Sequence, residues 1–462
     1  MSKIHQYTIM RKFITLTISF FLLVYFAPVQ LTAAQLSPKN DAKGKNEIQK
    51  NLSDTALLTL VQKQTFRYFW EFSHPVSGMA RERSNPAYGY GDEVVTTGGT
   101  GFGVMAVIVA TQRGWITRDS AARHLLKMVA FLSKADAYHG VFPHWMNGAT
   151  GKTIPFSRKD DGADLVESSY LFQGLLCVRQ YFDQDNNIES QLRNRINSLW
   201  NDVEWDWFTK GGEEVLYWHW SPNNGWAMNF PVRGYNECLI MYVLAASGER
   251  YPVTSAVYHR GWAQSNFFKN GKEFYGIKLP LGFDYGGPLF FSQYSFLGLD
   301  PTNLTDRYAN YWEQNKNHTL INRAWCIDNP QKFKGYGENC WGLTASDNFE
   351  GYNAHAPGND LGVITPTAAL SAFPYTPEYS MQALKHFYFD LGDKIWSDYG
   401  FVDAFSETNN WYATNYLAID QGPIIVMIEN YRTGLLWKLF MSCPEIQNGL
   451  KKLDFKSPSI GK

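Results

Sequence analysis

The chain lacks the charge imbalance, the apolar length and the cysteine spacing that mark several large classes of protein. Its 42 Lys and Arg residues nearly balance 43 Asp and Glu residues, for a formal net charge of −1, so we expect no basic surface for nucleic acid or anionic lipid. The apolar run at 13–26 is too short to span a bilayer comfortably. We therefore predict no nucleic-acid partner and no membrane insertion of the mature protein.

The five cysteines, at Cys177, Cys238, Cys326, Cys340 and Cys443, are few and odd in number. Their spacing matches no metal-ligand motif, so the sequence predicts no metal site and no cofactor. Cys177 and Cys238 lie in apolar helical stretches, which is typical of buried free thiols. Cys326 and Cys340 could form a disulfide in an oxidising compartment, and the sequence leaves that pairing open.

The N-terminus has the pattern of an export signal. Arg11 and Lys12 precede the apolar run, and Ala33 and Ala34 follow it as small residues at a plausible cleavage site. No cysteine stands after them to carry a lipid anchor. We expect a signal peptide over 1–34, a polar leader over 35–53, and a mature protein that is periplasmic or secreted.

No linker or low-complexity segment divides the rest, so we expect one domain over 54–443 and a C-terminal tail over 444–462. Aromatic residues make up 16% of the chain, and many Trp and Tyr stand beside Gly, Asn or Pro. Rings in such loops can stack on flat, weakly charged ligands, and carbohydrate is the natural candidate. Large cores also use aromatic residues, and we assign about half of these rings to packing.

Apolar residues recur at three- and four-residue spacing in about twelve stretches, which predicts a helical protein. Gly-punctuated stretches at 216–220 and 274–281 have the pattern of β-hairpins between helices. The helices are expected over 54–72, 99–113, 117–135, 164–182, 188–208, 235–246, 253–267, 290–297, 304–327, 360–372, 377–389 and 421–440.

Helices that are apolar nearly all round alternate with amphipathic ones, as inner helices covered by outer helices would. Six helical hairpins closed into a ring fit this pattern, so we predict an all-α (α/α)6 barrel with small hairpin insertions in its loops. A superhelical array of the same hairpins is the alternative, and the absence of a fixed-period repeat favours the ring. The loops that precede the inner helices would then meet at one end of the barrel.

An acidic run lies at the start of one of these inner helices. Asp160, Asp161, Asp164 and Glu167 fall within eight residues, and carboxylates so close raise each other's pKa, as the acid and base of a hydrolase require. Asp164 followed by Glu167 also fits a helix capping box, which implies no chemistry. The run is therefore either a site or a cap, and the two roles can coexist.

Three further carboxylates, Glu237, Asp347 and Asp420, stand beside glycines and aromatics near the start of later inner helices. Each also fits a cap or turn residue. Their repeated placement indicates that carboxylates gather at one end of the barrel. Hydrolysis of a glycosidic bond needs one protonated and one ionised carboxyl group.

Several segments together resemble the glucoamylase-like glycoside hydrolases, and among them the family 144 endo-β-1,2-glucanases. They are TTGGTGFG (96–103), VFPHW (141–145), DDGADLVE (160–167), WGLTASD (341–347), PTAAL (366–370) and DQGP (420–423). The resemblance implies an (α/α)6 barrel and inverting hydrolysis of linear β-1,2-glucan to sophoro-oligosaccharides. It also implies that Asp160, Asp164, Glu167 and Glu237 are active-site residues, although Asp161 leaves the first of these open by one position.

We expect Glu237 to be the general acid and a member of the group Asp160, Asp164 and Glu167 to be the base. An inverting enzyme separates acid and base by roughly 6.5–9.5 Å, which suits residues on different helices. Substrate contacts are expected from aromatic rings, arginines and further polar groups in the loops: Trp145, Trp220, Trp226, Tyr235, Trp341, Arg81, Arg83, Arg233, His144, Asp347 and Asp420.

Two other classes stay open, a polysaccharide lyase on the same barrel and a non-catalytic glycan-binding protein. The acidic run argues against a lyase, whose uronate substrate it would repel. A binding protein would use the aromatics without needing paired carboxylates. Another glycosidic linkage, such as that of starch, and exo rather than endo cleavage also stay open. We expect a monomer whose partner is a polysaccharide or oligosaccharide.

Overall fold

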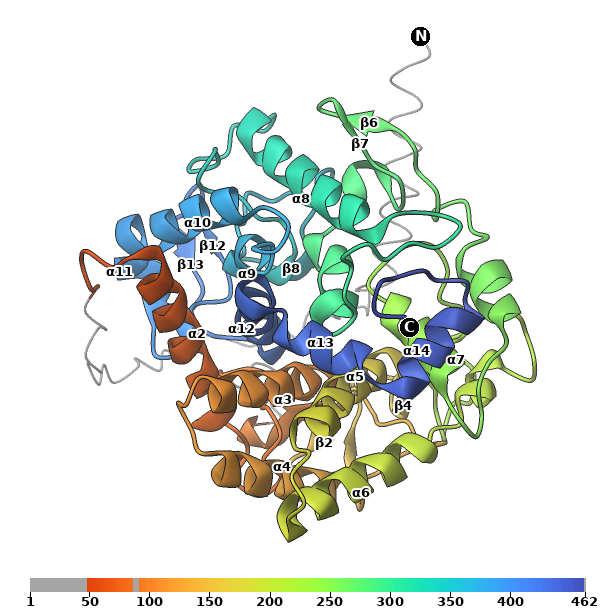
Figure 1. Ribbon diagram of the computed structural model, residues 1–462. Helices are drawn as coiled ribbons and strands as arrows, with labels where there is room; N and C mark the ends of the chain where they lie inside the picture. The colour runs from red at the N-terminus through yellow and green to blue at the C-terminus, as the bar shows by residue number, and fades with distance from the viewer. Residues whose placement is uncertain (1–47, 86–90, 461–462) are drawn as a thin grey trace.

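The computed structural model of the protein describes residues 48–85 and 91–460 (Figure 1). The expected signal peptide and the leader as far as residue 47 lie outside the described residues. Within the described ranges, no helix combines the length and the apolar character that a bilayer crossing needs. The protein is mostly helical with small antiparallel β-hairpins, as the sequence predicted.

The amphipathic stretches form the peripheral helices seen around the edge of Figure 1. In α4 only one stripe, including Leu125 and Val129, is buried, because the other face meets solvent. These helices are α2 (Asp54–Trp70), α4 (Arg118–Leu132), α6 (Asn187–Asn201), α8 (Tyr311–Asp328) and α10 (Pro377–Lys385), with α14 (Pro444–Lys452) near the C-terminus.

The stretches that are apolar all round form central helices buried by the others. Every residue of α3 from Thr97 to Ala110 is buried, and α3 packs directly on α5 and α12. Glycines allow the close approach, since a Cβ on Gly101 would lie 2.2 Å from the carbonyl oxygen of Tyr170. The central helices are α3 (Thr97–Gln112), α5 (Leu165–Tyr181), α7 (Leu239–Ser247), α9 (Pro366–Leu370) and α12 (Ala418–Thr433).

Several of the stretches predicted as helices form short π-helices or 3-10 helices in the structure. The stretch at 253–267 contains a π-helix, Val257–Trp262, and 290–297 forms the two 3-10 helices Leu289–Ser292 and Tyr294–Leu297. Further 3-10 helices are Gly91–Glu93, Trp205–Thr209 and Asp284–Gly286, and a second π-helix is His386–Asp390, followed by α11 (Gly392–Ile395).

The stretch expected as one helix over 421–440 is two. Gly434, at φ 67°, ends α12 in the left-handed conformation, and α13 (Leu435–Met441) follows it. Residues expected as a C-terminal tail form α14, which packs on α7. The apolar face of α14 therefore belongs to the folded domain.

The strands are two to four residues long and lie in loops between helices. The hairpin expected near 274–281 is present. The stretch 216–220 also folds back on the residues that follow it, through backbone hydrogen bonds of Trp218 with Phe230 and of Val232 with Leu216, and its β5 residues pair with β4 as well. The sheets are β1 (Val94–Thr96), β2 (Trp145–Asn147) and β3 (Thr153–Ile154); β4 (Ala163–Asp164) and β5 (His219–Trp220); β6 (Glu273–Phe274) and β7 (Ile277–Lys278); β8 (Ala345–Asn348) and β9 (Gly351–Ala354); β10 (Trp396–Ser397) and β11 (Gly400–Phe401); β12 (Phe405–Ser406) and β13 (Trp411–Tyr412).

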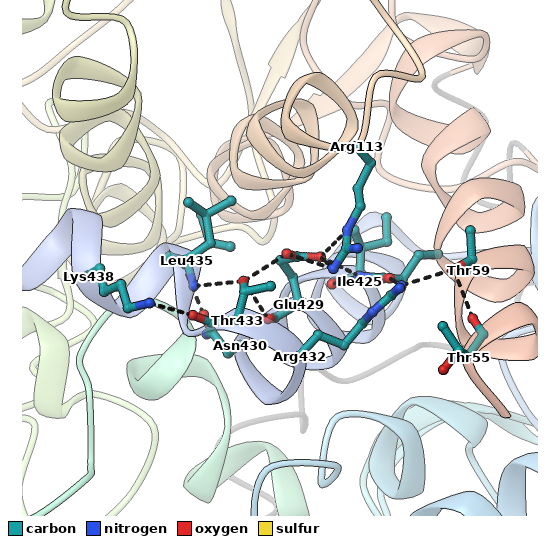
Figure 2. Close-up of polar contacts among 12 residues, drawn as sticks. Thr55, Thr59, Arg113, Ile425, Glu429, Asn430, Arg432, Thr433, Leu435 and Lys438 are labelled. Atoms are coloured by element: carbon teal, nitrogen blue, oxygen red, sulfur yellow. Dashed lines mark hydrogen bonds and ion pairs between the residues drawn. The ribbon is translucent and has the colours of Figure 1, made fainter.

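A buried ion pair joins the first and last long central helices (Figure 2). Arg113, just after α3, donates two hydrogen bonds of 2.9 and 3.0 Å to the carboxylate of Glu429 on α12. Glu429 is fully buried, and Gln62 of α2 donates to it at 3.3 Å. The network therefore ties α2, α3 and α12 together, so that an early and a late part of the described chain meet here.

All five cysteines are free and buried. The disulfide considered for Cys326 and Cys340 is therefore not formed in this structure.

Candidate active site

The acidic run lies where the sequence predicted, at the start of α5. Asp164 is the N-cap, and its Oδ1 accepts hydrogen bonds of 3.0 Å from the backbone N–H of Val166 and 2.9 Å from that of Glu167. Its Oδ2 lies 3.1 Å from Nδ1 of His144 and 3.6 Å from Nε2 of His219. Asp164 thus both caps the helix and belongs to a polar cluster.

Glu167 does not complete a capping box. Its Oε2 accepts a hydrogen bond of 2.9 Å from the backbone N–H of Gly98, at the start of α3. Glycine at position 98 allows this approach, because a Cβ there would lie 2.3 Å from that oxygen and would displace the Glu167 side chain. The starts of α3 and α5 therefore meet at Glu167, in agreement with the predicted gathering of inner-helix entrances.

Strand pairing adds His219, which the sequence analysis missed. In the two-residue sheet, Asp164 of β4 stands opposite His219 of β5. His219 Nε2 also lies 3.0 Å from Oδ2 of Asp160. No motif indicated this histidine, because its only link to the acidic run is the pairing of strands far apart in sequence.

Asp160 rather than Asp161 belongs to the cluster. Asp160 is 5% exposed, whereas Asp161 is half-buried and accepts hydrogen bonds from the side-chain amides of Asn223 and Asn224. Of the two neighbouring aspartates, Asp160 is therefore the one that lies with Asp164 and His219.

Burial and charge divide these groups into two protonation states. Burial disfavours the charged form of His144, but Glu167 and Asp164 outweigh it and raise the histidine pKa to about 9. For His219, burial is likewise outweighed by Asp160, and the pKa rises to about 10. Burial also opposes ionisation of Asp164, yet the two imidazoles hold the pKa of its carboxyl well below its usual range.

Glu167 and Glu237 are shifted in the opposite direction. Burial raises the pKa of Glu167 to about 7, even though the charge of His144 opposes the shift. Burial also raises the pKa of Glu237 to about 8, and the negative charge of Glu167 adds to the effect. Glu237 stands two residues before α7 begins at Leu239. Near neutral pH the site therefore holds a protonated carboxyl beside an ionised one.

A second acidic group lies at the start of α12 and includes Asp403, which the sequence analysis missed. Burial raises the pKa of Asp420 to about 7; burial and the charge of Asp420 raise that of Asp403. Asp347 donates its backbone N–H to Oδ2 of Asp403 at 2.8 Å and accepts two hydrogen bonds from Arg83, of 3.2 and 3.0 Å. Arg83 is thus held by a carboxylate rather than directed to solvent.

Aromatic rings cover the first cluster. Phe156, another residue missed in the sequence, stacks on His144 with ring centroids 4.1 Å apart and meets the indole of Trp145 edge-on at 4.8 Å. Phe156 is 36% exposed, whereas Trp145 is nearly buried. The exposed face beside the carboxylates therefore belongs mainly to Phe156.

A second aromatic group surrounds β5. Trp207, also missed, is exposed and stacks on His139 at 3.8 Å. Its ring lies 6.0 Å from that of Trp220 and 6.4 Å from that of Trp226. Since Trp220 directly follows His219, this group is continuous in the chain with the acidic cluster.

Four other residues predicted to contact substrate are buried or are hydrogen-bonded to the protein's own backbone. Trp341 and Tyr235 are 0% and 1% exposed, so neither ring can offer a face to a sugar, and both are corrections to the sequence prediction. Arg81 donates to the carbonyls of Asp92 and Phe72, and Arg233 donates to that of Gly261.

His144, Asp160 and Asp164 present ligand atoms within 4.8 Å of one another, a spacing that a metal ion could use. The raised pKa of His144 favours a proton on its imidazole instead, and a protonated imidazole has no lone pair for a metal. The residues fit a charge-paired cluster better than a metal site.

Comparison with known proteins shows that the chain is similar to the Glycoamylase family and to β-1,2-glucanases. The Glycoamylase family model matches residues 229–444. The endo-β-1,2-glucanase from Chitinophaga pinensis, solved as a sophorotriose and glucose complex, is 59% identical and has a TM-score of 0.86 over 88% of this chain and 100% of that one. A β-1,2-glucanase structure from Parabacteroides distasonis is 45% identical with a TM-score of 0.85, over 87% of this chain and 60% of that one.

A curated relative from Parabacteroides distasonis is an exo β-1,2-glucooligosaccharide sophorohydrolase acting at the non-reducing end. It is 44% identical over 439 residues, which is 90% of this chain. The chain spans 60% of the length of that relative.

Proposed function

The chain belongs to the Glycoamylase family, and we propose from that premise that it is a glycoside hydrolase of β-1,2-glucans. The observation that carries the proposal is the pair of opposite pKa shifts at one site, with Glu237 raised and Asp164 lowered. Hydrolysis of a glycosidic bond needs one carboxyl that gives a proton and one carboxylate that activates water. A glycan-binding protein would have no use for this division.

We infer that the helices form an (α/α)6 barrel. Buried and amphipathic elements alternate along the chain. Among the central segments, α3 packs on α5, α5 on α7, and α7 on the 3-10 helix Tyr294–Leu297, while that 3-10 helix and α9 both pack on α12. The first and last long central helices also pack on each other, which supports a closed ring over an open array.

Glu237 is the proposed general acid, because burial keeps its proton at neutral pH. The base comes from the cluster on the other helix. Asp164 has both oxygens engaged, one by two backbone N–H groups and the other by two imidazoles, which suits a residue that orients its neighbours. Asp160 contacts His219 through Oδ2 and is the stronger candidate for activating water.

Phe156 with Trp145, and Trp207 with Trp220 and Trp226, are the proposed stacking surfaces for glucose rings. Flat apolar faces beside polar groups are the usual means of sugar recognition. Phe156 lies directly on His144, so a sugar on its exposed face would be next to the acidic cluster.

The test is incubation of the protein, without residues 1–34, with linear β-1,2-, β-1,3- and β-1,4-glucans and with starch. We expect new reducing ends from β-1,2-glucan only, with inversion at the anomeric carbon. The size distribution of early products separates endo from exo cleavage, between which the relatives divide. Activity on starch without activity on β-1,2-glucan would refute the proposed substrate.

Export to the periplasm or the medium is a further part of this proposal, supported by the pattern of 1–34. Cell fractionation, with mass spectrometry of the mature N-terminus, tests it. We expect a monomer, which light scattering of the purified protein would establish.

A further inference from the structure

Cys340, His386 and Glu407 form a group of metal-ligand side chains that shares no residue with the candidate active site. One donor atom from each lies within 4.8 Å of the other two. The three come from separate segments: the loop between α8 and β8, the π-helix that follows α10, and the turn between β12 and β13. Only the tertiary fold brings them together.

The backbone around the group holds two of the side chains in place. Gly337 and Cys340 exchange backbone hydrogen bonds of 3.1 and 3.3 Å, so a tight turn presents the thiol. Glu407 lies against Gly335, where a Cβ would be 2.3 Å from Oε1. The backbone N–H of Lys334 donates at 2.7 Å to the hydroxyl of Thr408, next to Glu407, and this bond joins the two loops.

His386 is oriented as a metal-binding histidine is. Its Nδ1 lies 2.8 Å from Oδ2 of Asp390, and a carboxylate there accepts the proton of Nδ1, which leaves a lone pair on Nε2. Nε2 is buried and has no hydrogen-bond partner among the described residues. A buried polar atom without a hydrogen-bond partner lowers the stability of the folded protein, and a ligand bound to Nε2 would offset that cost.

The negative charge of the group also lacks a direct partner. The described residues provide no ion pair to Glu407, and the nearby Lys394 donates its hydrogen bond to the hydroxyl of Tyr412 instead. Cys340 is 4% exposed. A thiolate and a carboxylate with a neutral imidazole would balance a divalent cation.

We propose that Cys340, His386 and Glu407 bind one Zn²⁺ ion, with water as the fourth ligand. Sulfur, nitrogen and carboxylate oxygen are the ligand types of zinc, whereas Ca²⁺ and Mg²⁺ are bound through oxygen. Binding releases the thiol proton to solvent. The ion joins the loop that leads into β8 to the turn after β12. Of the second acidic group, Asp347 lies in β8 itself and Asp403 lies just before β12.

Cobalt(II) titration of the chelator-treated protein tests the proposal, because a thiolate ligand produces a sulfur-to-cobalt charge-transfer band. We expect the band to saturate at one equivalent and Zn²⁺ to abolish it. Cys340→Ala should lose the band and His386→Gln should weaken binding, whereas the matched control Cys443→Ala, which removes another buried free thiol, should behave as the wild type.

Asp390→Asn provides a graded variant that leaves all three ligands in place. Loss of the group that orients a ligand histidine weakens metal binding about 10- to 100-fold, so the band should remain but need more cobalt to saturate. Circular dichroism of each variant checks that it is folded. A wild-type protein without the charge-transfer band, a band unchanged by Cys340→Ala, or a Cys326–Cys340 disulfide in the purified protein would each overturn the proposal.

Discussion

Replacement of Glu237 by Gln tests the acid assignment most directly. Gln has nearly the same shape but no proton to give, and Oε2 of Glu237 has no hydrogen-bond partner among the described residues, so the change removes no such bond at that oxygen. We expect kcat on β-1,2-glucan at pH 7 to fall by about 10² to 10⁴, the usual contribution of a general acid. The melting temperature should stay close to that of the wild type.

The pH profile of the wild type follows from the raised pKa. Because the reaction needs the proton on Glu237, activity is present below its pKa of about 8 and lost above it. About nine-tenths of the carboxyl is protonated at pH 7 and about one-tenth at pH 9. The rate should therefore fall about tenfold between these two pH values, and this decline should be absent from the residual activity of the Gln variant.

Neighbouring groups titrate at other values, which separates their effects. The pKa of Glu167 is about 7, and those of His144 and His219 are about 9 and 10. Initial rates of reducing-end release should be measured from about pH 5 to about pH 10. In the control Glu167→Gln the alkaline limb should remain but move to a slightly lower pH, because the charge of Glu167 contributes to the raised pKa of Glu237. A Glu237→Gln enzyme within tenfold of the wild-type rate, or with its alkaline limb intact, would refute the reasoning.

Two further predictions concern single contacts. Arg113→Met leaves the carboxylate of Glu429 buried and without its cation, and should lower the free energy of unfolding by about 3–5 kcal/mol in chemical denaturation. The control Arg123→Met breaks an exposed pair and should cost less than about 1 kcal/mol; equal losses would contradict the importance of the buried pair. Gly98→Ala places a Cβ 2.3 Å from Oε2 of Glu167 and removes a charged hydrogen bond, so kcat/KM should fall about tenfold or more. Wild-type kcat/KM in this variant would show that the hydrogen bond from Gly98 to Glu167 is not needed for the reaction.

Helical periodicity predicted the long elements well and the short central ones less well. The peripheral helix α4 has one polar face, and its predicted stretch agrees with the structure to within three residues at each end. In α7 and α9 every residue is buried. A helix buried all round has no polar stripe, so its apolar run does not show where the helix begins.

The acidic run could be found from the sequence because its members are neighbours in the chain. Asp164 and Glu167 lie at the start of α5, and Asp160 lies in the loop just before it. His219 and Asp403 could not be found in this way, since β4–β5 pairing brings the first to Asp164 and packing of separate loops brings the second to Asp420. The aromatic composition indicated sugar recognition, but it did not separate Phe156, which is exposed, from Trp341, which is buried.

The sequence by itself determined what is local: helical class, the capping position of Asp164, the clustered carboxylates and the balanced net charge. The tertiary structure decided which groups ionise. Burial raises the pKa of Glu237, whereas two histidines lower that of Asp164. Both effects depend on distance and on solvent exclusion, and neither quantity follows from separation along the chain.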